Sequence, residues 1–122
     1  MKPHILVVDD EAPIRELLST FFQSRGYEVS SAGTAYDAMI KAAETSLALV
    51  LLDLVLPDAD GLEVLDSLKR THPDLPIIIM TGMGADDALL KEARDKGAAG
   101  YVSKTLPLDK LLAEVENLRG LR

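Results

Sequence analysis

The sequence LALVLLDLVLPDADG, residues 47–61, decides which fold this chain can adopt. Six apolar residues, 47–52, run without alternation into one carboxylate, Asp53, and a turn with Pro57 and Gly61 follows. A short apolar run without polar alternation predicts a strand buried on both faces, as in a parallel sheet covered by helices. Asp53 is then expected at the carboxyl end of a central strand, where open α/β sheets place their chemistry.

On both sides of this stretch, strand-like and helix-like segments alternate. Short apolar runs predict four further strands, at 4–8, 27–32, 76–80 and 99–102. Apolar residues at helical spacing predict five helices, over 14–21, 35–42, 62–68, 85–96 and 108–118. Pro13 suits the first turn of the first helix, and Thr34 is the expected cap of the second. The strand at 27–32 is the most polar, so we expect it at an edge of the sheet.

Five strands that alternate with five helices over short connections predict an α/β fold, a doubly wound parallel sheet. The 122 residues are enough for a hydrophobic core, and an apolar content of 48% is typical of a folded globular protein. There is no internal repeat, low-complexity segment or linker. We therefore expect residues 1–122 to form one domain.

The composition excludes several classes of function. The sequence has no cysteine, which rules out disulfides, thiol catalysis and cysteine-ligated metals. A formal net charge of −7 disfavours binding to nucleic acid or to anionic membranes. No apolar run approaches the roughly 20 residues of a membrane helix. We expect a cytoplasmic protein without direct nucleic acid contacts.

Polar residues stand at the carboxyl ends of four of the five predicted strands. They are Asp9 and Asp10, Asp53, Thr81 and Lys104. In a parallel sheet these ends share one edge, so the five side chains are expected to meet in space. Separately, the acids could be a helix-start signature or turn residues, and Lys104 a solvated lysine. Their coincidence at one edge favours a site.

The charges of this predicted site indicate a divalent cation. Three carboxylates repel one another, and with Lys104 they leave a charge of −2. Oxygen ligands without cysteine or a suitably spaced histidine point to Mg²⁺. A carboxylate can attack phosphorus to form an aspartyl phosphate, with the metal, Lys104 and the Thr81 hydroxyl offsetting the added negative charge. The residues present are sufficient for phosphoryl transfer onto Asp53.

Two other classes of function fit the sequence less well. A phosphatase or mutase of the haloacid dehalogenase type also forms an aspartyl phosphate, but it needs a second acid where Val55 stands and a cap domain for which the chain has no residues. A flavodoxin or dinucleotide binder needs a phosphate-cradling loop after the first strand, and acids stand there instead. The Asp58 and Asp60 pair is interpreted as part of a turn.

The motifs VVDDE (7–11), DLVLP (53–57) with Asp60-Gly61, Thr81-Gly82 and YVSK (101–104) together resemble the receiver domains of two-component response regulators. The resemblance spans the whole chain in order and spacing. It implies a flavodoxin-like (βα)5 fold with strand order 2-1-3-4-5. It also implies a signalling switch rather than an enzyme, one that assists its own phosphorylation and dephosphorylation.

By this resemblance, Asp53 accepts a phosphoryl group from the phosphohistidine of a sensor histidine kinase or phosphotransfer protein. Asp10, Asp53 and the main-chain carbonyl of Val55 are implied to bind Mg²⁺ directly, with Asp9 acting through water. Lys104 is implied to contact the phosphoryl group.

The resemblance also implies a conformational switch. Thr81 moves toward the phosphoryl group, and Tyr101 moves inward into the vacated space. The surface of the fourth helix, fifth strand and fifth helix then changes toward an output domain or target protein, and is a candidate homodimer interface.

The sequence departs from receivers at two places. Thr105 follows Lys104, where receivers usually have a proline joined by a cis bond. Because a cis bond without proline costs about 3–4 kcal/mol, we expect either a trans bond with Lys104 repositioned or a strained cis bond. In receivers, the residues two positions after the phosphoacceptor and two positions after the threonine flank the path of the hydrolytic water. Here these residues are Val55 and Met83, and because both are apolar, slow self-dephosphorylation is predicted.

Overall fold

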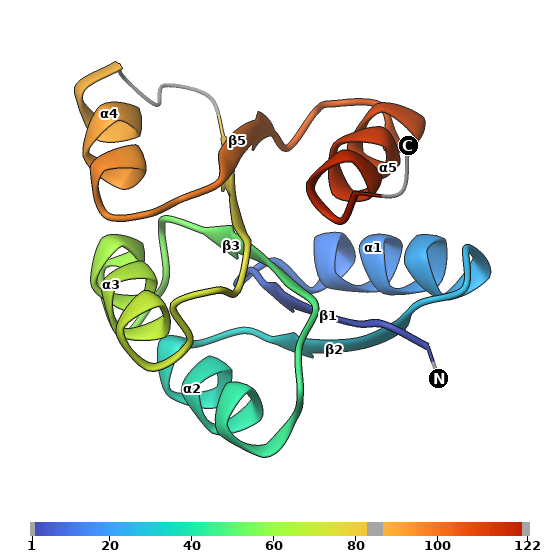
Figure 1. Cartoon of the computed structure of the whole chain (residues 1–122), viewed down its shortest axis with the longest axis horizontal. Coiled ribbons are helices and arrows are strands. Elements are labelled where there is room, and N and C mark those ends of the chain that lie inside the picture. The colour runs from blue at the N-terminus through green and yellow to red at the C-terminus, as the bar shows by residue number, and fades with distance from the viewer. Residues whose placement is uncertain (1, 83–86, 121–122) are drawn as a thin grey trace.

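The computed structural model of the chain describes residues 2–82 and 87–120, which form five strands and five helices in strict alternation. Figure 1 shows the arrangement. The elements are β1 (His4–Val8), α1 (Ala12–Ser24), β2 (Glu28–Ala32), α2 (Ala35–Glu44), β3 (Leu49–Asp53), α3 (Gly61–Thr71), β4 (Ile77–Thr81), α4 (Asp87–Asp95), β5 (Gly100–Ser103) and α5 (Leu108–Leu118). None of these helices combines the length and apolar character needed to cross a membrane.

The five strands form one parallel sheet in the order β2-β1-β3-β4-β5. The predicted fold class and strand order are both confirmed. The polar strand β2 lies at an edge, as expected, and β3 lies at the centre. In the register of the sheet, Leu52 pairs with Val8 on one side and with Ile79 on the other. All the carboxyl ends therefore point to the same edge.

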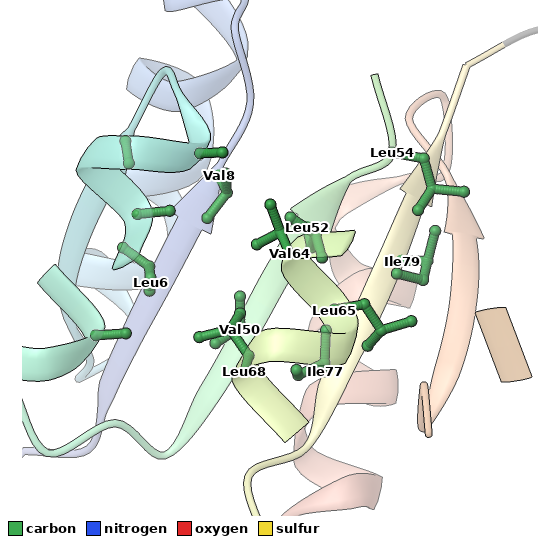
Figure 2. Close-up of a cluster of buried hydrophobic side chains, with 14 of the residues drawn as sticks. Leu6, Val8, Val50, Leu52, Leu54, Val64, Leu65, Leu68, Ile77 and Ile79 are labelled. Carbon is green, nitrogen blue, oxygen red and sulfur yellow. The ribbon is translucent and has the colours of Figure 1, made fainter. Parts of the chain in front are cut away.

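Helices cover both faces of the sheet, which is why the central strands need no polar alternation. In Figure 1, α1 and α5 lie on one side of the sheet and α2, α3 and α4 on the other. Val50 and Leu52 of β3 face the second group, where they pack with Leu65 and Leu68 of α3 (Figure 2). Leu49 and Leu51 face α1 and α5. Every residue of β3 is buried.

The local signals at the helix ends act as expected. Pro13 lies in the first turn of α1, and α1 ends just before Gly26, whose φ of +93° favours glycine. Thr34 caps α2 by accepting a hydrogen bond from the Asp37 N–H at 3.1 Å. The strand bounds differ from the prediction by one or two residues, so that Asp53 and Thr81 are the last residues of their strands. The predicted start of the fourth helix, at 85, lies outside the described residues.

Candidate functional site

The carboxyl ends of β1, β3, β4 and β5 surround a pocket of about 520 Å³. Its lining includes Asp10, Asp53, Thr81 and Lys104, which come from four separate strand ends. Asp9 lies just after β1, where its N–H continues the sheet by donating to the Ala32 carbonyl at 3.0 Å. The parallel sheet thus brings together residues that are up to 95 positions apart in the sequence, from Asp9 to Lys104.

Three carboxylates form the acidic part of the site. One oxygen from each of Asp9, Asp10 and Asp53 lies within 4.8 Å of the others. Asp9 is fully buried and Asp53 is 4% exposed, whereas Asp10 faces solvent. Backbone donors fix the two buried groups: the Glu11 N–H donates to Asp9 Oδ1 at 2.8 Å, and the Val55 N–H to Asp53 Oδ1 at 3.1 Å.

Lys104 supplies the opposing positive charge. Its Nζ lies 2.8 Å from Asp53 Oδ2, 2.9 Å from Asp9 Oδ2 and 2.8 Å from Glu11 Oε1. Burial alone would lower the pKa of Lys104, but the contacts with the carboxylates of Asp53, Glu11 and Asp9 outweigh it and raise the pKa above its usual value. The ammonium is therefore charged throughout the physiological range and stands directly against the predicted phosphoacceptor.

The pKa of Asp9 shifts toward the uncharged form, unlike that of Lys104. Burial raises its pKa, and the Glu11 N–H and the Lys104 ammonium only partly oppose this. Its Oδ2 is buried and accepts no hydrogen bond from any residue that the structure describes, although Lys104 is close enough for an ion pair. A buried carboxylate oxygen without a hydrogen bond is costly. The Lys104 ammonium, 2.9 Å away, offsets part of this cost.

The residues present fit the predicted magnesium ion. The carboxylates of Asp9, Asp10 and Asp53 provide only oxygen donors, which Mg²⁺ prefers. Asp9 contributes one of its carboxylate oxygens to this cluster. Val55 lines the same pocket. The donor set matches a hard divalent cation that keeps several of its waters.

Glu11 belongs to the site, although the sequence analysis did not assign it there. It occupies the cap position before α1, but its side chain makes no capping hydrogen bond. Its carboxylate instead accepts a hydrogen bond from Lys104, 93 residues away. Glu11 thus stands at a helix start, and its side chain also belongs to the site. An acid directly after the Asp9-Asp10 pair was the only available signal.

The Lys104–Thr105 peptide bond is trans, like every peptide bond in the described residues. Lys104 nevertheless contacts Asp53, so the expected repositioning that was coupled to a trans bond is wrong. The hydroxyls on either side of Lys104 are joined: Ser103 Oγ lies 2.7 Å from Thr105 Oγ1 and accepts the Thr105 N–H at 3.1 Å. A proline at 105 could not donate that second hydrogen bond. Proline at position 105 is therefore not needed for the contact between Lys104 and Asp53.

Of the two predicted switch residues, Thr81 lines the pocket and Tyr101 lies on β5. The Thr81 hydroxyl donates to the Val102 carbonyl of β5 at 3.2 Å. Tyr101 is 45% exposed, and the Arg94 guanidinium carbon lies 5.6 Å from the centre of its ring. The structure therefore describes an arrangement in which the hydroxyl is turned toward β5 and the tyrosine outward. The proposed movement of both residues stays a prediction.

The β3–α3 loop carries Val55, whose side chain is 73% exposed at the pocket. The loop closes on itself, since Val55 and Asp60 form an isolated bridge and the Gly61 N–H donates to the Leu54 carbonyl at 2.9 Å. Met83, the other residue predicted to slow hydrolysis, lies outside the described residues.

Asp58 and Asp60 are turn residues, as predicted, but each also has a specific partner. Asp60 caps α3 by accepting the Leu62 N–H at 2.9 Å. Asp58 accepts hydrogen bonds from two N–H groups of α2, those of Ala35 and Tyr36, which lower the pKa of its carboxyl group. Nothing in the sequence pattern indicated this second contact.

The sequence of this chain matches both a family profile and individual known proteins. The sequence profile of the response regulator receiver domain matches residues 5–116. YkoG of Bacillus subtilis (strain 168), described as an uncharacterized transcriptional regulatory protein, is 37% identical over 116 residues, which cover 93% of this chain and 50% of YkoG. The transcriptional regulatory protein SrrA of Staphylococcus aureus (strain NCTC 8325 / PS 47) is 35% identical over 118 residues, 97% of this chain and 48% of SrrA. The chain thus spans about half the length of these relatives.

A solved structure resembles the chain over nearly its whole length. The crystal structure of the receiver domain of NtrX from Brucella abortus superimposes with a TM-score of 0.89 and a sequence identity of 32%. The match covers 97% of this chain and 99% of that domain.

Proposed function

The chain belongs to the response regulator receiver domain family, and we propose that it is a switch driven by phosphorylation of Asp53. In this proposal, residues 1–122 act as one receiver unit. The phosphoryl donor is the phosphohistidine of a sensor histidine kinase or phosphotransfer protein. The recipient of the signal is an output domain or a separate target protein.

The observation that carries this proposal is the contact between Lys104 and Asp53. Lys104 Nζ lies 2.8 Å from Asp53 Oδ2, while the other oxygen of Asp53 is held by the Val55 N–H. A nucleophile needs a fixed orientation, and an incoming phosphoryl group needs a cation that is already in place. Both requirements are met at this carboxylate. Asp9 has similar partners in the Glu11 N–H and Lys104, but it is fully buried and does not line the pocket. Asp10 faces solvent.

In the proposed reaction, a carboxylate oxygen of Asp53 forms a bond to phosphorus as the bond from phosphorus to the histidine nitrogen breaks. The electron pair of the broken bond stays on the imidazole nitrogen, which takes up a proton. Lys104 then exchanges its contact with the free carboxylate for one with a phosphoryl oxygen. The barrier falls because the ammonium is preorganised beside the growing negative charge.

We assign the metal site to Asp10, Asp53 and the Val55 carbonyl, with Asp9 acting through water. When bound, Mg²⁺ would neutralise charge on the phosphoryl oxygens. The clustering of the three carboxylates, one oxygen of each lying within 4.8 Å of the others, supports this assignment.

The proposed switch begins at Thr81. Its hydroxyl must give up the hydrogen bond to the Val102 carbonyl before it can donate to a phosphoryl group. That release would affect β5, which carries Tyr101, and Tyr101 would leave its position beside Arg94. The α4–β5–α5 surface would then change, for a partner or for a second copy of the chain. We regard the chain as a cytoplasmic signalling protein that assists its own phosphorylation and dephosphorylation, rather than an enzyme that acts on other substrates.

The proposal is tested by incubating the chain with acetyl phosphate and Mg²⁺ and measuring its intact mass. Wild type is expected to gain one phosphoryl group, with release of acetate, and Asp53→Asn to gain none. Asp66→Asn is the matched control, because it removes a partly exposed carboxylate on α3 that does not line the pocket. Phosphorylation of Asp53→Asn at the wild-type rate would place the acceptor elsewhere.

A further inference from the structure

The loop between β3 and α3, residues 54–60, carries the Val55 carbonyl of the proposed metal site. Its base is well fixed: Leu54 is buried, and its carbonyl accepts the Gly61 N–H. Its tip is more exposed, and Pro57 and Asp58 both face solvent. The position of a main-chain ligand in such a loop depends on what holds the tip.

Asp58 connects this tip to a different element. Its Oδ1 accepts the Ala35 N–H at 2.8 Å, and its Oδ2 accepts the Tyr36 N–H at 3.0 Å. These are the first two residues of α2, which lie more than twenty positions earlier in the chain. Both oxygens of the Asp58 carboxylate thus join the loop to α2, which packs on the same face of the sheet as α3 (Figure 1).

The N-terminus of α2 is built to receive this carboxylate. Thr34 serves the next two N–H groups, accepting from Asp37 with its side chain and from Ala38 with its carbonyl. The N–H groups of Ala35 and Tyr36 are left for another acceptor, as is usual at a helix start. A negative charge is favoured at this end of a helix, and the lowered pKa of Asp58 agrees with that.

We infer that Asp58 is a positioning residue for the metal site: its carboxylate holds the β3–α3 loop on the N-terminus of α2 and thereby keeps the Val55 carbonyl in place for Mg²⁺. This inference rests on the proposed function, because it takes the Val55 carbonyl to be a ligand. Its physical basis is preorganisation, since a loop that is already ordered loses less conformational entropy when the ion binds. Asp58 itself touches neither the ion nor the phosphoryl group.

The test compares Mg²⁺ binding, measured by titration calorimetry, with stability, measured by urea unfolding without metal. Asp58→Ala releases the loop, and Asp58→Asn is a milder variant of the same size. Thr34→Ala is the matched control, because it weakens the same helix terminus but leaves the Asp58 contact intact. Hydrogen exchange at the Ala35 and Tyr36 amides reports directly whether the contact is lost.

Asp58→Ala is expected to raise the Kd for Mg²⁺ by about tenfold, the lower end for residues that support a metal ligand. Thr34→Ala is expected to lower the urea midpoint without changing that Kd. The inference is overturned if Asp58→Ala leaves the Kd unchanged, or if both variants change it equally. A wild-type chain that binds no Mg²⁺ would overturn the proposed metal site together with the inference, whereas normal binding by Asp58→Ala would overturn the inference alone.

Discussion

At the level of single residues, the site is a balance of charges around Lys104. Its ammonium is within ion-pair distance of Asp9, Glu11 and Asp53, and two of these carboxylates are buried. The presence of Asp9, Asp53 and Lys104 was predictable because parallel strands end at a common edge. Glu11 was not, because an acid before a helix is usual and its long side chain can reach in many directions.

Replacing Lys104 by Met is expected to lower the free energy of unfolding by about 2–3 kcal/mol in the absence of metal, because Asp9 and Asp53 remain buried without a counter-charge. Added Mg²⁺ should restore part of that loss. Urea unfolding with and without Mg²⁺ measures both. Lys91→Met, which changes an exposed lysine of α4, should stay within about 0.5 kcal/mol of wild type. Equal stability of the two variants without metal would show that the ammonium does not offset buried charge.

The exposed side chain of Val55 leads to a kinetic prediction. A valine beside Asp53 cannot orient a water molecule for attack on the phosphoryl group. Val55→Asn should therefore shorten the lifetime of the phosphorylated protein by a factor on the order of ten, less than a true general base would give. The decay of phosphorylated protein after removal of the donor measures this. An unchanged lifetime would show that the residue at 55 does not govern hydrolysis.

The hydrogen bonds of Asp58 make stability depend on pH. They lower its pKa in the folded state, so their contribution is complete above the unfolded pKa of about 4 and is lost as the pH falls through the folded value. The urea midpoint of wild type should exceed that of Asp58→Asn at neutral pH, and the two should converge as the pH falls below the unfolded pKa of Asp58 and through its lowered folded pKa. A difference that stays constant over this range would mean that the charge of Asp58 is not involved.

At the level of elements, the sequence pattern predicted every strand and helix, but their ends only to within a few residues. Apolar runs define which residues face the core, whereas hydrogen bonds define where a strand ends. Thus β4 and β5 each lie one residue later than predicted, which places Thr81 inside its strand. The strand order needed the resemblance to receivers, because alternation alone leaves several right-handed arrangements open.

The close approach of α3 to Leu54, the first residue of the β3–α3 loop, depends on Gly61. A Cβ built at this position would lie 2.4 Å from the Leu54 Cα, which is backbone and cannot turn aside. Gly61→Ala should therefore cost about 2–3 kcal/mol of stability, measured by urea unfolding, and displace the loop that carries Val55. Gly100→Ala is the matched control, since a Cβ there meets no atom within 4 Å. Similar small effects of both substitutions would contradict the close packing.

At the level of the whole molecule, the fold connects the carboxylates with a distant surface through very few steps. Asp53 contacts Lys104, Lys104 follows β5, and Thr81 at the end of β4 is hydrogen-bonded to the Val102 carbonyl of β5. We therefore expect a charge change at the acidic edge to act on β5, an edge strand of the sheet. This is the physical reason to expect that phosphorylation alters the α4–β5–α5 surface.

The central claim is that Asp53 becomes an acyl phosphate. The most direct measurement is to phosphorylate the chain with acetyl phosphate and Mg²⁺, reduce it with borohydride and map the product by peptide mass spectrometry. An acyl phosphate on Asp53 is converted to homoserine, so homoserine is expected at position 53 and nowhere else. Homoserine at Asp9 or Asp10, or a phosphoryl group that resists reduction because it sits on a hydroxyl such as that of Thr81, would contradict the account.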